Sequence, residues 1–175
     1  NVASFVGAGG VRANVMGFAD RRPNGEELAR MEALVRQAMA EGAVGLSAAL
    51  IYAPDSYADT AELIALARAA AEYDGLFAAH LRSEGETFLE ALDEFLTVVR
   101  QAGIRGEIYH LKASGRGNWP KLATVIERVE AARAAGLPVT ADMYTYHASS
   151  TGLDAMMPGW VQEGGHRAWV ERLRD

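Results

Sequence analysis

The sequence predicts an α/β fold of parallel strands that form a (β/α) barrel of the TIM type. Short apolar runs alternate with longer helical patterns, and the runs recur about every 32 residues, the length of one βα unit. Such units produce parallel strands with right-handed crossovers. Half of the 175 residues are hydrophobic, which suffices for the core of one domain. We therefore expect residues 1–175 to form a single domain.

Each predicted element follows from its own pattern. Apolar runs predict strands at Val2–Val6, Ala43–Ser47, Leu76–His80, Glu107–His110 and Val139–Met143. Apolar residues three and four apart predict helices at about Gly25–Glu41, Thr60–Tyr73, Glu84–Ala102 and Trp119–Ala135, with a last helix that starts near Gly165. Glycine closes several helices before the next strand, as in "EYDGLFAA", because it readily adopts the left-handed conformation of a helix end.

Polar residues gather where the predicted strands end. A barrel and a doubly wound sheet both place function at the carboxyl ends of their strands. Here four neighbouring strands are each followed by a polar pair: Ser47 with Tyr52, His80 with Arg82, His110 with Lys112, and Asp142 with Tyr144. Polar groups from four strands fit the rim of a barrel better than a single crevice.

The composition excludes several classes of function. With 17 basic and 23 acidic side chains the net charge is −6, and without a basic stripe nucleic acid is not an expected partner. There is no cysteine, so a metal site must use His, Asp or Glu. No apolar run approaches the roughly 18 residues of a membrane span, and no signal peptide pattern is present. We expect a cytoplasmic protein without a membrane partner, and the absent initial methionine suggests a piece of a longer chain.

Two similar segments, "AAHLRSEG" and "IYHLKASG", carry the main chemical signal. Each ends a strand with histidine, leucine and a basic residue, so neighbouring parallel strands would present His80 and His110 at the same height. Imidazole is a common metal ligand, and two strand ends would hold the pair rigidly. Core histidines bonded to the backbone are the alternative for either one alone, whereas the repetition favours a metal site.

The basic residues after these histidines allow two interpretations each. Lys112 lies two residues beyond His110, so its ammonium can hold a substrate carboxylate or remain an exposed loop lysine. Arg82 has the equivalent place after His80, and it can instead pair with Glu84 or Glu86.

A third cluster, "TADMYTYHASST", is rich in hydrogen-bond donors that suit an oxyanion or carboxylate. An ordered turn held by its own side chains is the plainer interpretation. Ser150 with His147 as its base could form a serine hydrolase site, but no glycine elbow surrounds the serine.

The glycines of "VGAGGVR" do not form a dinucleotide site. Arg12 stands where the third glycine of that fingerprint is required, and no acidic residue ends a second strand about 20 residues later. We expect this segment to be a flexible loop at the rim.

Five motifs together resemble the N-acyl-D-amino-acid deacylases (D-aminoacylases) of the amidohydrolase superfamily. They are "EGAVGLSAALIYAP", "HLRSEG", "HLKASG", "NW" and "DMYTYHASST", which agree in order and spacing over nearly the whole chain. The resemblance implies a (β/α)8 barrel with one or two zinc ions, in which a metal-activated water attacks the amide bond of an N-acyl-D-amino acid. Zinc would lower the pKa of the water and polarise the scissile carbonyl.

The resemblance also implies roles for individual residues. His80 and His110 match the two metal-binding histidines after the fifth and sixth strands. Lys112, Tyr144 and Ser150 match positions that hold the α-carboxylate of the substrate.

The same resemblance implies an incomplete site. The chain would supply about strands three to seven of the barrel, and the remaining barrel strands of the full-length protein would be its partner. The first-strand His-x-His pair, the bridging Cys or Glu and the late Asp that shuttles the proton would lie outside these residues. We expect the isolated chain to be inactive, and its open barrel edges to promote association.

Two positions depart from the family pattern. Ala8 stands where a histidine is usual, and Thr145 replaces the proline between two tyrosines. A hydrolase of cyclic amides, similar to dihydroorotase or hydantoinase, and a non-catalytic barrel that binds a carboxylated ligand are the alternatives. The change at Ala8 gives the non-catalytic alternative some support.

Overall fold

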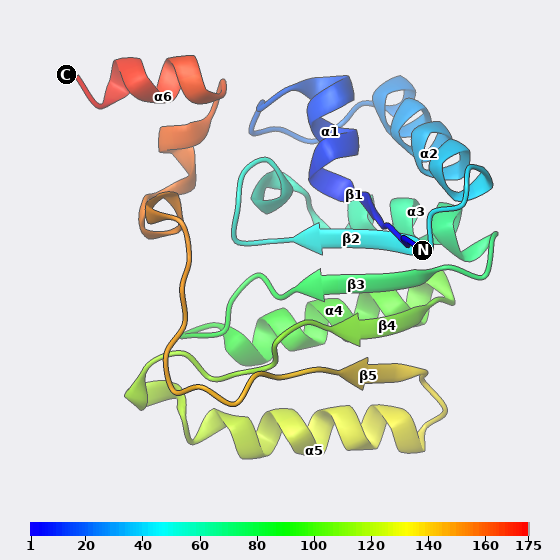
Figure 1. Cartoon of the computed structure of the whole chain (residues 1–175), viewed down its shortest axis with the longest axis vertical. Coiled ribbons are helices and arrows are strands. Elements are labelled where there is room, and N and C mark those ends of the chain that lie inside the picture. Colours follow the sequence, from blue (N-terminus) through cyan, green and yellow to red (C-terminus); the bar gives the residue numbers. More distant parts are fainter. Residues whose placement is uncertain (175) are drawn as a thin grey trace.

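Five parallel strands stand side by side in chain order, β1-β2-β3-β4-β5, in the computed structural model, which describes residues 1–174 (Figure 1). The strands are β1 (Val6–Gly7), β2 (Gly45–Ala49), β3 (Leu76–His80), β4 (Arg105–Ile108) and β5 (Val139–Ala141). The order never reverses, as it would in a doubly wound sheet. This arrangement confirms the predicted barrel type, of which the chain forms a part.

Helices follow the strands, and those after the first do so as the periodicity predicts. They are α1 (Ala8–Met16), α2 (Gly25–Ala40), α3 (Thr60–Ala71), α4 (Phe88–Ala102), α5 (Lys121–Ala134) and α6 (His166–Arg172). Asn24 begins α2 with a capping box: its side chain accepts from the Glu27 backbone N–H, and the Glu27 side chain accepts from the Asn24 backbone N–H. Among residues 1–174, no helix is long and apolar enough to cross a bilayer.

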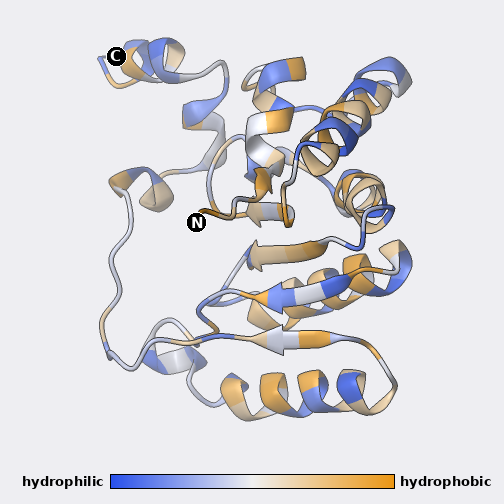
Figure 2. Cartoon of the chain, turned by 45° about the vertical axis from the view of Figure 1, so that its right-hand side comes forward, coloured by the Kyte–Doolittle hydropathy of each residue, from blue (hydrophilic) through white to orange (hydrophobic). Residues whose placement is uncertain are grey.

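The core lies between the sheet and these helices. Phe77 of β3 stacks on Phe95 of α4 with ring centroids 5.7 Å apart, and Figure 2 shows hydrophobic residues along the strands and on part of each helix. At Gly106 of β4 an added Cβ would lie 2.5 Å from Val99 Cγ2. Glycine therefore allows α4 to approach β4 closely, which fixes the height of the strand that leads to His110.

The start of the chain differs from two expectations. The predicted strand Val2–Val6 was wrong in extent, because only Val6 and Gly7 find partners in β2, at Leu46 and Ser47. The segment "VGAGGVR" is also not a flexible loop: α1 begins at Ala8, and Ala8, Val11 and Arg12 are buried.

The glycines of this segment serve close packing. An added Cβ at Gly9 would lie 2.9 Å from Asp55 Oδ1, so the first turn of α1 packs directly against that carboxyl group. Glycine at this position makes room for Asp55, which explains why the segment looked flexible from its composition.

Other boundaries differ by a few residues. β3 spans the predicted range, whereas β4 ends at Ile108 and leaves His110 in a turn with φ of 39°. The backbone N–H of His110 donates to Asp142 Oδ1 at 2.5 Å, and this side-chain contact replaces a continued strand ladder. The segment that follows β5 then runs across the carboxyl ends of the strands (Figure 1).

Candidate metal centre

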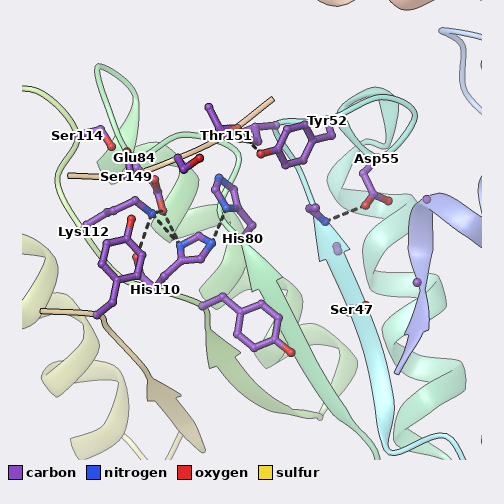
Figure 3. A pocket seen from close by; sticks show the side chains of 18 of the residues that line it. Ser47, Tyr52, Asp55, His80, Glu84, His110, Lys112, Ser114, Ser149 and Thr151 are labelled. Atoms are coloured by element: carbon purple, nitrogen blue, oxygen red, sulfur yellow. Dashed lines mark hydrogen bonds and ion pairs between the residues drawn. The ribbon is translucent and has the colours of Figure 1, made fainter. Parts of the chain in front are cut away.

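A pocket of about 980 Å³ opens at the carboxyl ends of the strands. Its wall includes Ser47, Tyr52, Asp55, His80, Glu84, His110, Lys112, Tyr144, Ser149, Ser150 and Thr151 (Figure 3). Every substrate or metal residue expected from the sequence lines this single pocket. The parallel strands explain the convergence, because their carboxyl ends meet on one edge of the sheet.

His80 and His110 face each other directly. His80 is the last residue of β3 and His110 follows β4 by two residues, and His80 Nδ1 lies 2.7 Å from His110 Nε2. Burial lowers the pKa of His80 to about 4. At neutral pH this imidazole is therefore uncharged, which is the form that binds a metal ion.

The donor set fits a divalent metal. The imidazoles of His80 and His110 and the carboxylate of Glu84 offer ligand atoms that all lie within 4.8 Å of one another. Ligands of a tetrahedral zinc stand about 3.3 Å apart at bond lengths of roughly 2.0–2.1 Å. Small side-chain rotations would open the 2.7 Å separation of the two histidine nitrogens to that value.

Glu84 and Lys112 form the next layer around His110. Glu84 Oε1 accepts from Lys112 Nζ at 2.6 Å and lies 3.0 Å from His110 Nδ1. Lys112 Nζ is also 2.9 Å from His110 Nδ1. The sequence left the roles of Lys112 and Glu84 open, and the structure shows that both side chains converge on Nδ1 of this imidazole.

The Tyr144 phenol ring stands beside this group. Its ring centroid is 6.2 Å from that of His110, and Lys112 Nζ lies 5.3 Å from the Tyr144 centroid. On the opposite side, the Tyr52 ring lies 6.1 Å from the His80 ring. The pocket therefore has an order: Tyr52, the two histidines, and then Tyr144 with Lys112.

The loop that holds Ser150 is tied across the pocket. The hydroxyls of Tyr52 and Thr151 contact each other, and Tyr57 Oη donates to the Gly159 carbonyl at 2.8 Å. Ser150 lines the main pocket, whereas His147 lines an adjacent cavity. Within residues 1–174 no hydrogen bond joins Ser150 to His147, so the geometry gives no support to a serine nucleophile activated by that histidine.

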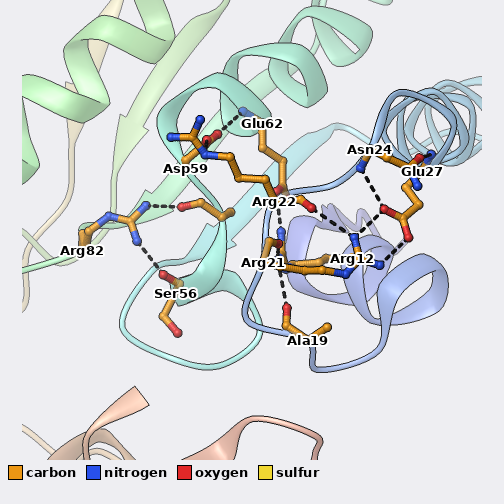
Figure 4. A network of polar contacts seen from close by, with 11 residues as sticks. Arg12, Ala19, Arg21, Arg22, Asn24, Glu27, Ser56, Asp59, Glu62 and Arg82 are labelled. Carbon is orange, nitrogen blue, oxygen red and sulfur yellow. Dashed lines mark hydrogen bonds and ion pairs between the residues drawn. The ribbon is translucent and has the colours of Figure 1, made fainter. Parts of the chain in front are cut away.

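Arg82 does not serve the pocket in either expected way. Its guanidinium pairs with Glu94 of α4, at 2.8 Å from Nε to Oε2, and donates to the carbonyls of Ser56 and Ala58 (Figure 4). Of the alternatives that the sequence left open, pairing with Glu84 or Glu86 is not what the structure shows, since the partner is Glu94, and Arg82 is not among the residues that line the pocket. Arg82 instead holds the loop after β2 against α4.

Asp55 is a pocket residue that the sequence did not reveal. It begins a 3₁₀ turn in the loop held by Arg82, and its Oδ2 accepts from the Ala49 backbone N–H at 2.8 Å. Burial raises the pKa of this carboxyl group to about 6. The one available signal was its place in the loop that follows a strand, where functional residues of a barrel gather.

Comparison with known proteins decides the family. No family model matches the chain. The chain is 39% identical over 151 residues to an N-acyl-D-glutamate deacylase of Alcaligenes xylosoxydans xylosoxydans. It is 37% identical, over the same length, to a D-aminoacylase of that organism. The chain is a segment of the N-acyl-D-amino-acid deacylase family. The alignments cover 86% of this chain and 31% of each relative, so the chain spans about a third of their length.

Solved structures agree with this assignment. The N-acyl-D-glutamate deacylase of Bordetella bronchiseptica, solved with zinc and a phosphonate mimic of the tetrahedral intermediate, matches with a TM-score of 0.80 and 34% identity. A D-aminoacylase described as defining a novel subset of amidohydrolases matches equally, and each match covers 83% of this chain and 31% of the other. The fold of this chain is therefore part of an amidohydrolase TIM barrel.

Proposed function

We propose that the protein hydrolyses the amide bond of N-acyl-D-amino acids with the help of one or two zinc ions. In this proposal His80 and His110 bind the metal, and Lys112, Tyr144 and Ser150 hold the α-carboxylate of the substrate. The observation that carries it is the 2.7 Å approach of His80 Nδ1 to His110 Nε2 at the ends of neighbouring parallel strands, with the Lys112 ammonium 2.9 Å from His110.

The side chains divide the work by position. When bound, zinc would polarise the scissile carbonyl and activate the attacking water. Lys112 and the Tyr144 phenol, on one side of the histidines, offer an ammonium and a hydroxyl to a carboxylate. A substrate anchored there would place its amide at the histidines and its acyl group toward Tyr52. The ring distances of 6.2 Å from His110 to Tyr144 and 6.1 Å from His80 to Tyr52 support this order.

The relatives support a linear amide as substrate. Their names specify N-acyl-D-glutamate, N-acyl-D-aspartate and D-amino acids in general, and one D-aminoacylase structure is described as having a binuclear metal centre. These names favour deacylation over the hydrolysis of a cyclic amide. They also favour a catalytic barrel over a non-catalytic one that binds a carboxylated ligand, because all three relatives are named as enzymes.

We also propose that residues 1–175 form one partial barrel domain, completed by barrel strands outside this chain. Large apolar side chains after β5 are exposed, among them Met143, Tyr146, Leu153, Met156 and Trp160. The missing strands would cover part of this surface, so the isolated chain is expected to associate and to show no turnover. A monodisperse monomer in small-angle scattering would contradict this expectation. A cytoplasmic location stays a prediction of the sequence.

A chimera tests the activity. These residues would replace the matching segment of the 39% identical N-acyl-D-glutamate deacylase, which supplies the other strands. We expect deacylation of N-acyl-D-amino acids but not of their L forms or of dihydroorotate, and its loss in His80→Ala and His110→Ala. His166→Ala is the matched control, because this histidine is exposed on α6. Retained activity in both histidine variants would refute the metal assignment.

A further inference from the structure

One carboxylate oxygen, Glu84 Oε1, serves two partners of the proposed site. It accepts from Lys112 Nζ at 2.6 Å and lies 3.0 Å from His110 Nδ1. The Glu84 side chain is 9% exposed, although it comes from the loop between β3 and α4. A largely buried carboxylate this close to two nitrogen atoms is constrained by both of them.

The geometry of His110 separates Glu84 from the space between the histidines. The two nitrogens of an imidazole point to opposite sides of the ring, and when one binds a metal the other carries a proton. His110 Nε2 faces His80 Nδ1 at 2.7 Å, whereas His110 Nδ1 lies 3.0 Å from Glu84 Oε1 and 2.9 Å from Lys112 Nζ. The ammonium can only donate, so the tautomer of His110 decides which of these two neighbours Nδ1 bonds: with a proton it donates to Glu84, without one it accepts from Lys112. A metal between the two histidines would therefore bind Nε2, and Glu84 would meet the other nitrogen. In this arrangement Glu84 supports a ligand and is not one itself, although its carboxylate lies within 4.8 Å of the donor atoms of both histidines.

We propose that Glu84 is a positioning residue that fixes the proton of His110 on Nδ1 and so presents the Nε2 lone pair to the metal. This inference rests on the proposed metal-binding function of His80 and His110. Carboxylates that accept the free N–H of a metal-bound histidine fix the tautomer and raise the basicity of the ligand. Glu84 has the position and the burial for this role.

The same oxygen also orients Lys112. Its ammonium points at Glu84 and lies 5.3 Å from the Tyr144 ring centroid, on the side proposed for the substrate carboxylate. Glu84 would therefore hold the metal ligand and the carboxylate-binding cation in fixed relation to each other. Loss of Lys112 would leave the full charge of Glu84 to His110 and would remove a cation from the neighbourhood of the metal.

This difference gives a test in the chimera proposed above, whose other strands complete the barrel. The wild type there is the chimera with the residues of this chain unchanged. Zinc affinity would be measured by competition with a chromophoric chelator for the wild type, Glu84→Gln, Lys112→Met and the control Glu86→Gln, whose side chain is exposed. We expect Glu84→Gln to weaken zinc binding about 10–100-fold, and Lys112→Met and Glu86→Gln to leave it unchanged or tighter. Circular dichroism would show that each variant keeps its fold.

Equal losses of zinc affinity in Glu84→Gln and Lys112→Met would overturn the proposal, because they would show that Glu84 acts only through its ion pair with Lys112, by holding the loop in place. A second readout needs no variant: ¹⁵N-detected imidazole spectra of the zinc-loaded wild type should place the proton of His110 on Nδ1 and zinc on Nε2. The reverse tautomer would also overturn it. If the His80→Ala variant bound zinc as tightly as the wild type, the proposed metal site itself would be refuted.

Discussion

Asp55→Asn should remove a pH-dependent loss of stability from this protein. In the folded chain the Asp55 side chain is 9% exposed, its Oδ2 accepts from the Ala49 N–H, and its Oδ1 is buried without a partner among the described residues. Burial raises the pKa of the carboxyl group from 3.8 to about 6, while Glu62 adds to the rise and Arg12 opposes it. The amide of Asn keeps an acceptor for Ala49 but carries no charge.

The size of the effect follows from the two pKa values. Below pH 3.8 the carboxyl group is protonated in both the folded and the unfolded chain, and it costs no stability. As the pH rises through about 6, the folded chain must hold a buried negative charge that the unfolded chain exposes to water. Each tenfold difference in proton affinity is worth about 1.4 kcal/mol, so the loss reaches about 3 kcal/mol above the folded pKa.

Urea unfolding followed by circular dichroism would measure this loss at several pH values from below 3.8 to above 6, because the folded and unfolded chains differ in protonation of Asp55 between these two pKa values. The wild type should lose about 3 kcal/mol relative to Asp55→Asn as the pH rises through this range. Asp20→Asn makes the same chemical change on an exposed loop and should run parallel to the wild type. A constant difference between the wild type and Asp55→Asn across the range would show that the Asp55 pKa is not raised by folding.

Three further substitutions test the scaffold around the site. Glu62→Ala would leave the fully buried Arg12 guanidinium without its ion-pair partner (Figure 4) and should cost about 3–5 kcal/mol in urea unfolding. Gly106→Ala places a methyl group 2.5 Å from Val99 Cγ2. It should destabilise the fold by about 1–3 kcal/mol, seen as a lower melting temperature, and adding Val99→Ala should restore part of the lost stability. Asp142→Ala removes the side chain that holds the turn after β4, and zinc affinity should drop about tenfold while the circular dichroism spectrum stays unchanged.

The helices after α1 and the parallel strands could be predicted from the sequence because they depend on local patterns, whereas α1 was missed because its glycines suggested a loop. β3 spans the predicted residues, and α2 to α5 lie within a few residues of expectation. The failure at Val2–Val6 has a different cause, since a strand also needs a partner and β2 offers one only to Val6 and Gly7. Apolar composition alone does not reveal where pairing stops.

The candidate site was predictable to the extent that it repeats along the chain. His80 and His110 follow equivalent strands, so their repetition and the parallel sheet predicted that they meet. Arg82 holds the same sequence position as Lys112, yet it turns toward Glu94 while Lys112 turns toward Glu84. Sequence position alone could not separate the two basic residues, because their partners come from different elements.

The sequence by itself determined that this chain is a run of βα units with two histidines and a lysine at the strand ends. These features depend on periodicity, on glycine at helix ends and on the type of residue that ends each strand. Only the tertiary structure decided which ring nitrogen of His110 faces His80, which acid accepts from Lys112, and that Asp55 enters the same pocket. Those facts depend on side-chain direction and burial, which arise when segments far apart in the sequence pack against one another.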